Sequence, residues 1–109
     1  MKEDSFSIQI KKSDGTLTMD FKGQLTINYI QKIKEVVNEK VDFSQDISVN
    51  VDNPDNLDIT FLQLLQSMKT TAELNKKQLS VSSTLPSELD SLVSNAGFSD
   101  LLNSNPVNN

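Results

Sequence analysis

Three aspartates at intervals of three residues are the first group in this sequence that could do chemistry. Asp52, Asp55 and Asp58 lie in one Asn- and Pro-containing segment, and carboxylate oxygens are the ligands that Mg²⁺ and Ca²⁺ prefer. The spacing differs from that of an EF-hand loop, because the sixth position carries no glycine and Gln63 stands where the closing glutamate belongs. We therefore predict no metal site, and expect a solvated turn in which Asp58 lies near the start of a helix.

Other side chains with catalytic potential are sparse. Glu35 and Glu39 are four residues apart, which on a helix is typical of a solvated face rather than a pair of catalytic carboxylates. The sequence contains no His and no Cys, which excludes a Ser-His-Asp triad, a cysteine nucleophile and a zinc or iron site built on imidazole or thiolate. We predict a protein that is not an enzyme and carries no cofactor.

The charge balance and the chain ends bear on partners and location. The 109 residues include ten Lys, no Arg and 15 acidic residues, for a net charge of −5, which is not typical of a nucleic-acid-binding protein. No apolar segment follows the charged residues 1–5, and no apolar run approaches the roughly 20 residues of a membrane span. We expect a cytoplasmic protein that is not embedded in a membrane, with one domain over residues 1–102 and a disordered tail over residues 103–109.

Two kinds of hydrophobic period predict the elements that position these residues. Apolar and polar residues alternate over 5–11 and 16–21 around an Asp14-Gly15 turn, which predicts a hairpin. Alternation also predicts strands over 47–51 and 78–82.

Three further segments carry single apolar stripes with helical spacing. The stripes are Ile30, Ile33, Val36 and Val37; Phe61, Leu64, Leu65, Met68 and Ala72; and Leu89, Leu92, Val93 and Ala96. Thr26 is placed to cap the first helix, and Gly97 to close the third. The order β-β-α-β-α-β-α predicts one α/β domain with a mixed sheet of four to five strands.

Three short stretches, in a fixed order, also match the motifs of a known family. Gly23-Gln24-Leu25-Thr26 precedes the first predicted helix, residues 57–65 (LDITFLQLL) begin the second, and residues 85–101 contain the third and end in Gly-Phe-Ser-Asp-Leu. They are similar to Gly-x-Leu-(Asp/Thr), (Ile/Val)-Asp-Ser-(Ser/Ala)-Gly-Leu-x-x-Leu and Gly-(Leu/Phe)-x-x-(Leu/Ile) of the STAS domain family. This is the module of anti-sigma factor antagonists and sulfate-transporter tails, and the resemblance covers residues 5–102.

The resemblance implies helices on one face of the sheet and no catalysis. In the antagonist branch it also implies a serine at the start of the second helix that an anti-sigma kinase phosphorylates; the unphosphorylated form binds the kinase and releases the sigma factor. Here that position is Ile59, which has no hydroxyl, and the family's glycine is replaced by Phe61. Thr60 is a candidate substitute acceptor, or it caps or packs the helix start.

We predict a partner-binding surface formed by the loop before the second helix and by the start of that helix. Its residues are Asp58, Ile59, Thr60, Leu62, Gln63 and Gln66, with Leu62 expected to be partly exposed. The resemblance implies a serine kinase or anti-sigma factor as partner. The alternative is another STAS branch, the cytoplasmic subunits of lipid-transport ABC systems, which bind a transporter ATPase; their Thr directly follows the Asp, where this chain has Ile59.

Overall fold

The computed structural model describes residues 6–98 and 101, so the tail predicted for residues 103–109 lies outside the described residues. The strands are β1 (Phe6–Ser13), β2 (Thr16–Leu25), β3 (Asp46–Asp52), β4 (Asn56–Leu57) and β5 (Leu79–Thr84). The helices are α1 (Ile30–Lys40), α2 (Ile59–Leu74) and α3 (Ser87–Asn95). The predicted order is confirmed except for β4, which forms in a segment expected to be a loop.

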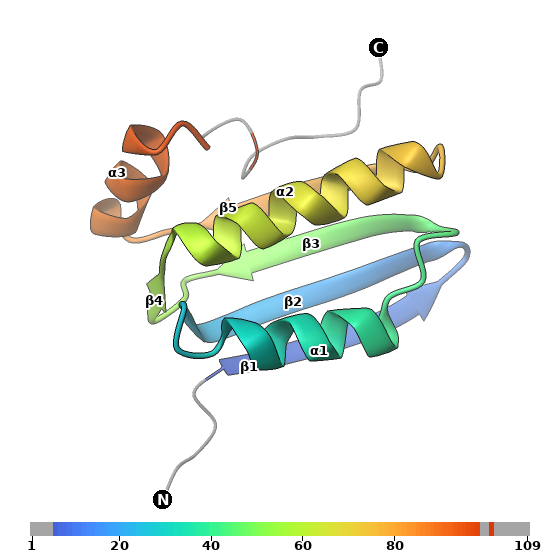
Figure 1. Cartoon of the computed structure of the whole chain (residues 1–109), viewed down its shortest axis with the longest axis horizontal. Helices are drawn as coiled ribbons and strands as arrows, with labels where there is room; N and C mark the ends of the chain where they lie inside the picture. The colour runs from blue at the N-terminus through green and yellow to red at the C-terminus, as the bar shows by residue number, and fades with distance from the viewer. Residues whose placement is uncertain (1–5, 99–100, 102–109) are drawn as a thin grey trace, which may run out of the picture.

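The sheet is mixed, as the sequence predicted. Strands β1, β2, β3 and β5 lie side by side in that order. β1 runs antiparallel to β2, whereas β3 runs parallel to both β2 and β5, and β4 pairs in parallel with the last two residues of β2. Helices α1 and α2 lie across the same face of this sheet (Figure 1). Each follows a strand of the parallel part, so both helices begin near the C-terminal ends of these strands.

Alternation along the strands separates the core from the open face of the sheet. In β2, Leu17, Met19 and Phe21 are fully buried under the helices, and the residues between them point the other way and are half-buried. Burial of each such side chain stabilises the fold by about 1.5–3 kcal/mol. α2, with 16 residues, gives the core six side chains, and no helix in the described part of the chain is long and apolar enough to cross a membrane.

The expected role of Thr26 as a cap is wrong. α1 begins four residues later, with Tyr29 at the N-cap position and no side-chain cap. The backbone carbonyl of Thr26 instead accepts a hydrogen bond from the N–H of Tyr29 at 2.9 Å, which closes a turn before the helix. The side chain of Thr26 is buried, and its Oγ1 has no hydrogen-bond partner among the described residues.

Helix α3 ends as predicted but packs differently. Gly97 has φ +83°, and the N–H of Phe98 donates to the carbonyl of Val93 at 2.9 Å, which is the glycine-dependent Schellman ending. Of the expected apolar stripe, however, only Val93 is buried; Leu92 is 37% exposed and Ala96 is exposed. The expectation fails because α3 follows the edge strand β5 and reaches the core with a narrow face.

Candidate functional site

Asp58 fixes the start of α2. It lies at the N-cap in an extended conformation, and its Oδ1 accepts a hydrogen bond from the backbone N–H of Thr60 at 3.0 Å. The hydroxyl of Thr60 donates to the same oxygen. Since the first N–H groups of a helix lack partners within the helix, this carboxylate satisfies one such donor, and its negative charge interacts favourably with the positive end of the helix dipole. The prediction that Asp58 lies near the helix start is confirmed.

The other oxygen of Asp58 ties the start of α2 to a distant loop. Oδ2 accepts a hydrogen bond from the backbone N–H of Ile27 at 2.8 Å. The backbone N–H of Asp58 itself donates to the carbonyl of Leu25 at 3.1 Å, next to the two-residue pairing of β4 with β2. The loop between β2 and α1 and the first turn of α2 therefore form one hydrogen-bonded unit.

Two isoleucines stand out from this unit. Ile27 is 62% exposed and Ile59 is 45% exposed, and they are two of the four large hydrophobic side chains that are exposed among the described residues. Ile27 donates its backbone N–H to Asp58, and Ile59 follows Asp58 in the chain. Both apolar side chains are therefore presented by a backbone that Asp58 holds in place.

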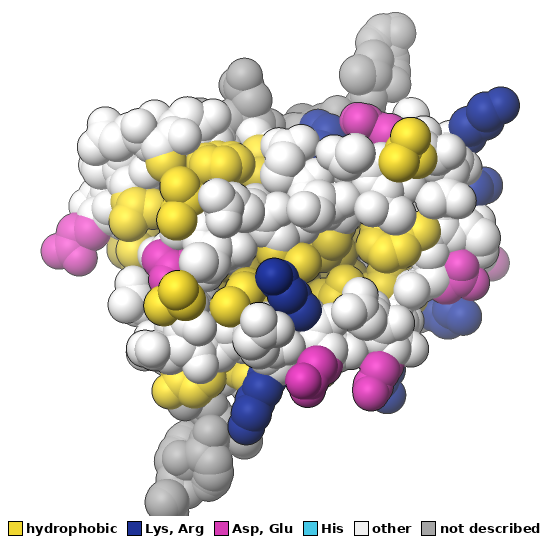
Figure 2. Space-filling model, viewed as in Figure 1, with side chains coloured by type: hydrophobic (Ala, Val, Ile, Leu, Met, Phe, Trp, Pro, Cys, Tyr) yellow, Lys and Arg dark blue, Asp and Glu magenta, His cyan; other side chains and the backbone are white. Residues whose placement is uncertain are grey.

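A groove between α1 and α2 continues from this position. It has a volume of about 580 Å³ and is lined by Ile27, Ile30, Gln31, Lys34, Asn38, Thr60, Gln63, Leu64 and Ser67. Hydrophobic side chains are visible along the line between the two helices in Figure 2. Among the described residues that line the groove, only Lys34 is charged, so the lining combines an apolar strip with a single ammonium group. We call the surface formed by Ile27, Asp58, Ile59, Thr60 and Gln63 the α2 corner.

The structure assembles only part of the surface predicted from sequence. Thr60 and Gln63 line the groove, and Gln66 is exposed but is not part of the lining. Leu62 is 0% exposed, so its expected role as a partly exposed contact is wrong. α2 crosses the sheet between α1 and α3 (Figure 1), and its buried sector is wider than a single stripe.

Sequence reasoning missed the residues that α1 and its preceding loop contribute. Ile27 and Lys34 belong to the groove but lie outside residues 57–65, the motif that predicts the start of α2. A signal was present for Ile27, because it is apolar and precedes the helical stripe that begins at Ile30. For Lys34 no signal distinguishes it from other lysines on the outer face of α1.

Phe61, which replaces the family's glycine, belongs to the core. Its side chain is fully buried and meets the ring of Phe21 edge-on, with ring centroids 5.1 Å apart, a favoured aromatic geometry. The first turn of α2 is thus anchored to the middle of β2 by packing and to the β2–α1 loop by hydrogen bonds.

The three aspartates of the first motif do not converge. Asp58 caps α2, whereas Asp52 lies at the end of β3 and lines a hollow on the open face of the sheet. Within the described ranges, no group of three or more acidic side chains is placed to hold a metal ion. The motif therefore serves the turn and the helix start.

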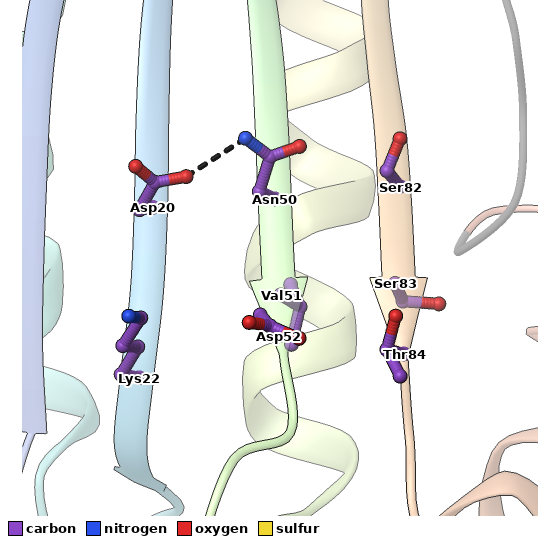
Figure 3. A pocket seen from close by; sticks show the side chains of 8 residues that line it. All are labelled: Asp20, Lys22, Asn50, Val51, Asp52, Ser82, Ser83 and Thr84. Atoms are coloured by element: carbon purple, nitrogen blue, oxygen red, sulfur yellow. Dashed lines mark hydrogen bonds between the residues drawn. The ribbon is translucent and has the colours of Figure 1, made fainter.

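The hollow on the open face is polar. It has a volume of about 360 Å³, and the side chains that line it include Asp20, Lys22, Asn50, Asp52 and Ser82 (Figure 3). The Nδ2 of Asn50 donates to the Oδ1 of Asp20 at 2.7 Å across the β2–β3 pair. Charges of both signs share this depression, and it has no apolar floor comparable to that of the helical groove.

Comparison with known proteins bears on the fold. No family model matches the sequence, and no curated protein matches it. Among solved structures, the chain is similar to the crystal structure of an antisigma-factor antagonist, a STAS domain from Rhodobacter sphaeroides, with a TM-score of 0.53. The match covers 68% of this chain and 82% of that chain at 13% sequence identity.

The architecture, the sheet order and this likeness define a single α/β domain with a STAS-like fold. The resemblance seen in the sequence is confirmed at the level of the fold. What the α2 corner binds is a separate question.

Proposed function

We propose that this protein is a non-catalytic docking module of the anti-sigma-factor-antagonist type, which binds a serine kinase or anti-sigma factor in the cytoplasm through the α2 corner. The observation that carries the proposal is the pair of exposed isoleucines, Ile27 and Ile59, on a backbone held by the Asp58 carboxylate. A preformed surface of this kind loses little conformational entropy when a partner binds.

The energetics favour a protein partner at this surface. Burial of two isoleucine side chains that are now partly exposed contributes on the order of 1–3 kcal/mol each, less the fraction already buried. The polar residues around them, Thr60 and Gln63, supply a rim that can hydrogen-bond. A few apolar anchors inside a polar rim are the usual arrangement of a binding hot spot.

The same site supports a proposal on regulation. Ile59 occupies the position of the family's phosphoacceptor and has no hydroxyl, so Thr60 is the acceptor that the α2 corner offers. Its hydroxyl is hydrogen-bonded to Asp58, and a phosphate there would place two further negative charges beside that carboxylate. Phosphorylation of Thr60 would therefore oppose the Asp58 contacts and weaken docking.

A second candidate is favoured by the loss of the serine. A module that cannot be phosphorylated at position 59 suits permanent attachment, as in an accessory subunit bound to the ATPase of a lipid-transport ABC system. The two candidates share the α2 corner and differ in the partner, so one experiment addresses both.

The test is affinity capture with the full chain as bait in a lysate of its source, followed by mass spectrometry and by titration of the identified partner. The variant Ile27→Ser/Ile59→Ser removes both anchors. The control Leu74→Ser removes an equally apolar side chain, 79% exposed, at the far end of α2. Substitutions at such exposed positions change stability by about 0.5 kcal/mol or less.

The proposal predicts capture of a kinase-type or anti-sigma-type protein by the wild type and by Leu74→Ser. It also predicts at least about tenfold weaker binding by the double variant, a loss of about 1.4 kcal/mol. Capture of a transporter ATPase with the same dependence supports the second candidate. A partner that binds the double variant as tightly as the wild type contradicts docking at the α2 corner.

A further inference from the structure

A second apolar hollow lies on the other flank of α1, under the edge of the sheet. In β1, the side chains that face the helices, Phe6, Ile8 and Ile10, are only half-buried. The β2 side chains that face the helices, Leu17, Met19 and Phe21, are fully buried. The helices therefore cover these β2 side chains and leave a strip of β1 partly uncovered.

The uncovered strip is a slot lined by apolar and cationic side chains. Its volume is about 470 Å³, and it is lined by Ile8, Ile10, Leu17, Val36, Lys12 and Lys40. Four of these side chains are apolar and the other two are cations. Val36 and Lys40 are one helical turn apart on α1, and Lys12 continues the row of Ile8 and Ile10 along β1, so the ammonium groups lie at the same end of the slot.

The charged side chains that line this end of the slot are both cationic. The charge of Lys12 also acts on Asp42, whose pKa is lowered by its hydrogen bonds with Ser44 and by that charge. Its carboxylate accepts the backbone N–H of Ser44 at 2.9 Å. The described residues that line the slot thus include two lysines and no acidic residue, in a protein whose overall charge is −5. An anion is favoured at this end even though the whole molecule repels it.

We propose that this slot binds a linear alkyl chain that ends in an anionic head group, such as a medium-chain carboxylate. The chain would lie against Ile8, Ile10, Leu17 and Val36, with its head between Lys12 and Lys40. The volume falls within the range of about 300–1,000 Å³ that is usual for small-molecule sites. The lining side chains offer no hydrogen-bond acceptor, so they match neither a polar metabolite nor a peptide backbone.

The site is separate from the α2 corner. The groove at that corner uses Ile30, Gln31, Lys34 and Asn38 of α1, and the slot uses Val36 and Lys40. The ligand proposal therefore stands or falls independently of the proposed protein partner.

The first measurement is titration of the full chain with octanoate, decanoate and dodecanoate below their critical micelle concentrations. Calorimetry and methyl NMR monitor the binding. The expected result is saturable one-to-one binding that tightens by about three- to fourfold with each added methylene. The methyl signals of Ile8, Ile10, Leu17 and Val36 should shift, and those of Ile27 and Ile59 should not. Dodecanol and dodecyltrimethylammonium should bind at least tenfold more weakly than dodecanoate.

The second measurement uses the two lysines of the slot and, as a control, a third lysine that is adjacent to one of them in the chain. Lys12→Glu and Lys40→Glu should each weaken dodecanoate binding about tenfold, and Lys11→Glu, on the opposite face of β1, should leave it within twofold. All three positions are exposed, and matching thermal melts check that each variant is folded. The glutamine variants at 12 and 40 should weaken binding less than the glutamates.

Four results would overturn the proposal. One is the absence of saturable binding, and another is equal binding of dodecyltrimethylammonium and dodecanoate. The other two concern the variants and a competing peptide. The third is a Lys11→Glu variant that loses as much affinity as Lys12→Glu. The fourth is an acidic amphipathic peptide that shifts the same methyl signals at lower concentration than dodecanoate, which would assign the slot to a protein segment.

Discussion

The carboxylate of Asp58 accepts a hydrogen bond from the backbone N–H of Ile27 at 2.8 Å, across 31 residues of sequence. The same side chain caps α2 through the backbone N–H of Thr60. One residue thus decides both where α2 begins and where the exposed Ile27 side chain stands.

Removal of the Asp58 carboxylate should lower the free energy of unfolding by more than the loss of an ordinary N-cap does. Asp58→Ala should lower the free energy of unfolding by about 2 kcal/mol, the upper end of the range for N-cap loss, because the contact with the β2–α1 loop is lost as well. Urea unfolding measures the loss, and hydrogen exchange should show reduced protection of the Ile27 amide. In Asp58→Asn only one oxygen remains, so an intermediate loss is expected; a loss equal to zero in both variants would contradict the double role.

Leu62 and Ile59 should respond in opposite ways to truncation. Leu62→Ala should destabilise the protein by about 2–5 kcal/mol because the side chain is fully buried. Ile59→Ala should change stability by about 0.5 kcal/mol or less and should weaken partner binding. Denaturation curves of the two variants, measured side by side, test the assignment of one to the core and the other to the surface.

These two neighbours show how far the sequence predicts the site. The motif located the start of α2 correctly, because a capping Asp before an apolar helix is a local signal. Helical periodicity gives the angular position of Leu62 on its own helix, but it does not say which elements flank that helix. Burial of Leu62 depends on those flanks, and Ile27 joins the site only through a hydrogen bond across 31 residues.

The fold was more predictable than the site. Strands β1, β2, β3 and β5 each alternate over at least four residues, so their period is visible in the sequence. β4 has two residues and no period; it exists because its backbone meets the end of β2. The prediction for α3 fails for a similar reason. An apolar stripe shows which side of a helix can be buried, but it does not show how much of that side the adjacent elements cover.

A negative charge at position 60 should disturb docking without unfolding the protein. Thr60→Glu should weaken partner binding at least tenfold, because it adds a carboxylate to the α2 corner, next to the carboxylate of Asp58 that the Thr60 hydroxyl contacts. Thr60→Val, which lacks the hydroxyl but adds no charge, should bind within about threefold of the wild type, and Thr70→Glu is a control on an exposed position of the same helix. Titration with the identified partner decides: unchanged affinity in Thr60→Glu would exclude Thr60 from the contact.

The open face of the sheet offers a prediction in pH. Asp20 and Asn50 are direct partners in the β2–β3 register and are hydrogen-bonded, so Asn50→Asp would place two carboxylates opposite each other. Their repulsion should raise a carboxyl pKa in the folded state above its unfolded value of about 4. The folded state then holds more protons than the unfolded state, so stability should fall as the pH rises.

At pH 7 the free energy of unfolding of Asn50→Asp should be about 1 kcal/mol lower than that of the wild type, and this difference should shrink towards pH 3. Thermal or urea unfolding across this range measures it. Asn50→Ser, which removes the hydrogen bond without adding charge, is the control, and its loss of stability should vary less with pH than that of Asn50→Asp. An Asn50→Asp difference that varies no more with pH than the Asn50→Ser difference would show that the two side chains do not face each other.

The hydrogen bonds around the α2 corner have a consequence for behaviour at high concentration. The N–H of Asp55 donates to the carbonyl of Gly23 at 2.8 Å, that of Asp58 to Leu25 at 3.1 Å, and that of Tyr29 to Thr26 at 2.9 Å. Self-association of β proteins usually starts at strand edges with free donors and acceptors. Ile27 and Ile59 lie beside backbone N–H groups that are already hydrogen-bonded, so the α2 corner exposes two apolar side chains without these donors being available to a strand of a second chain.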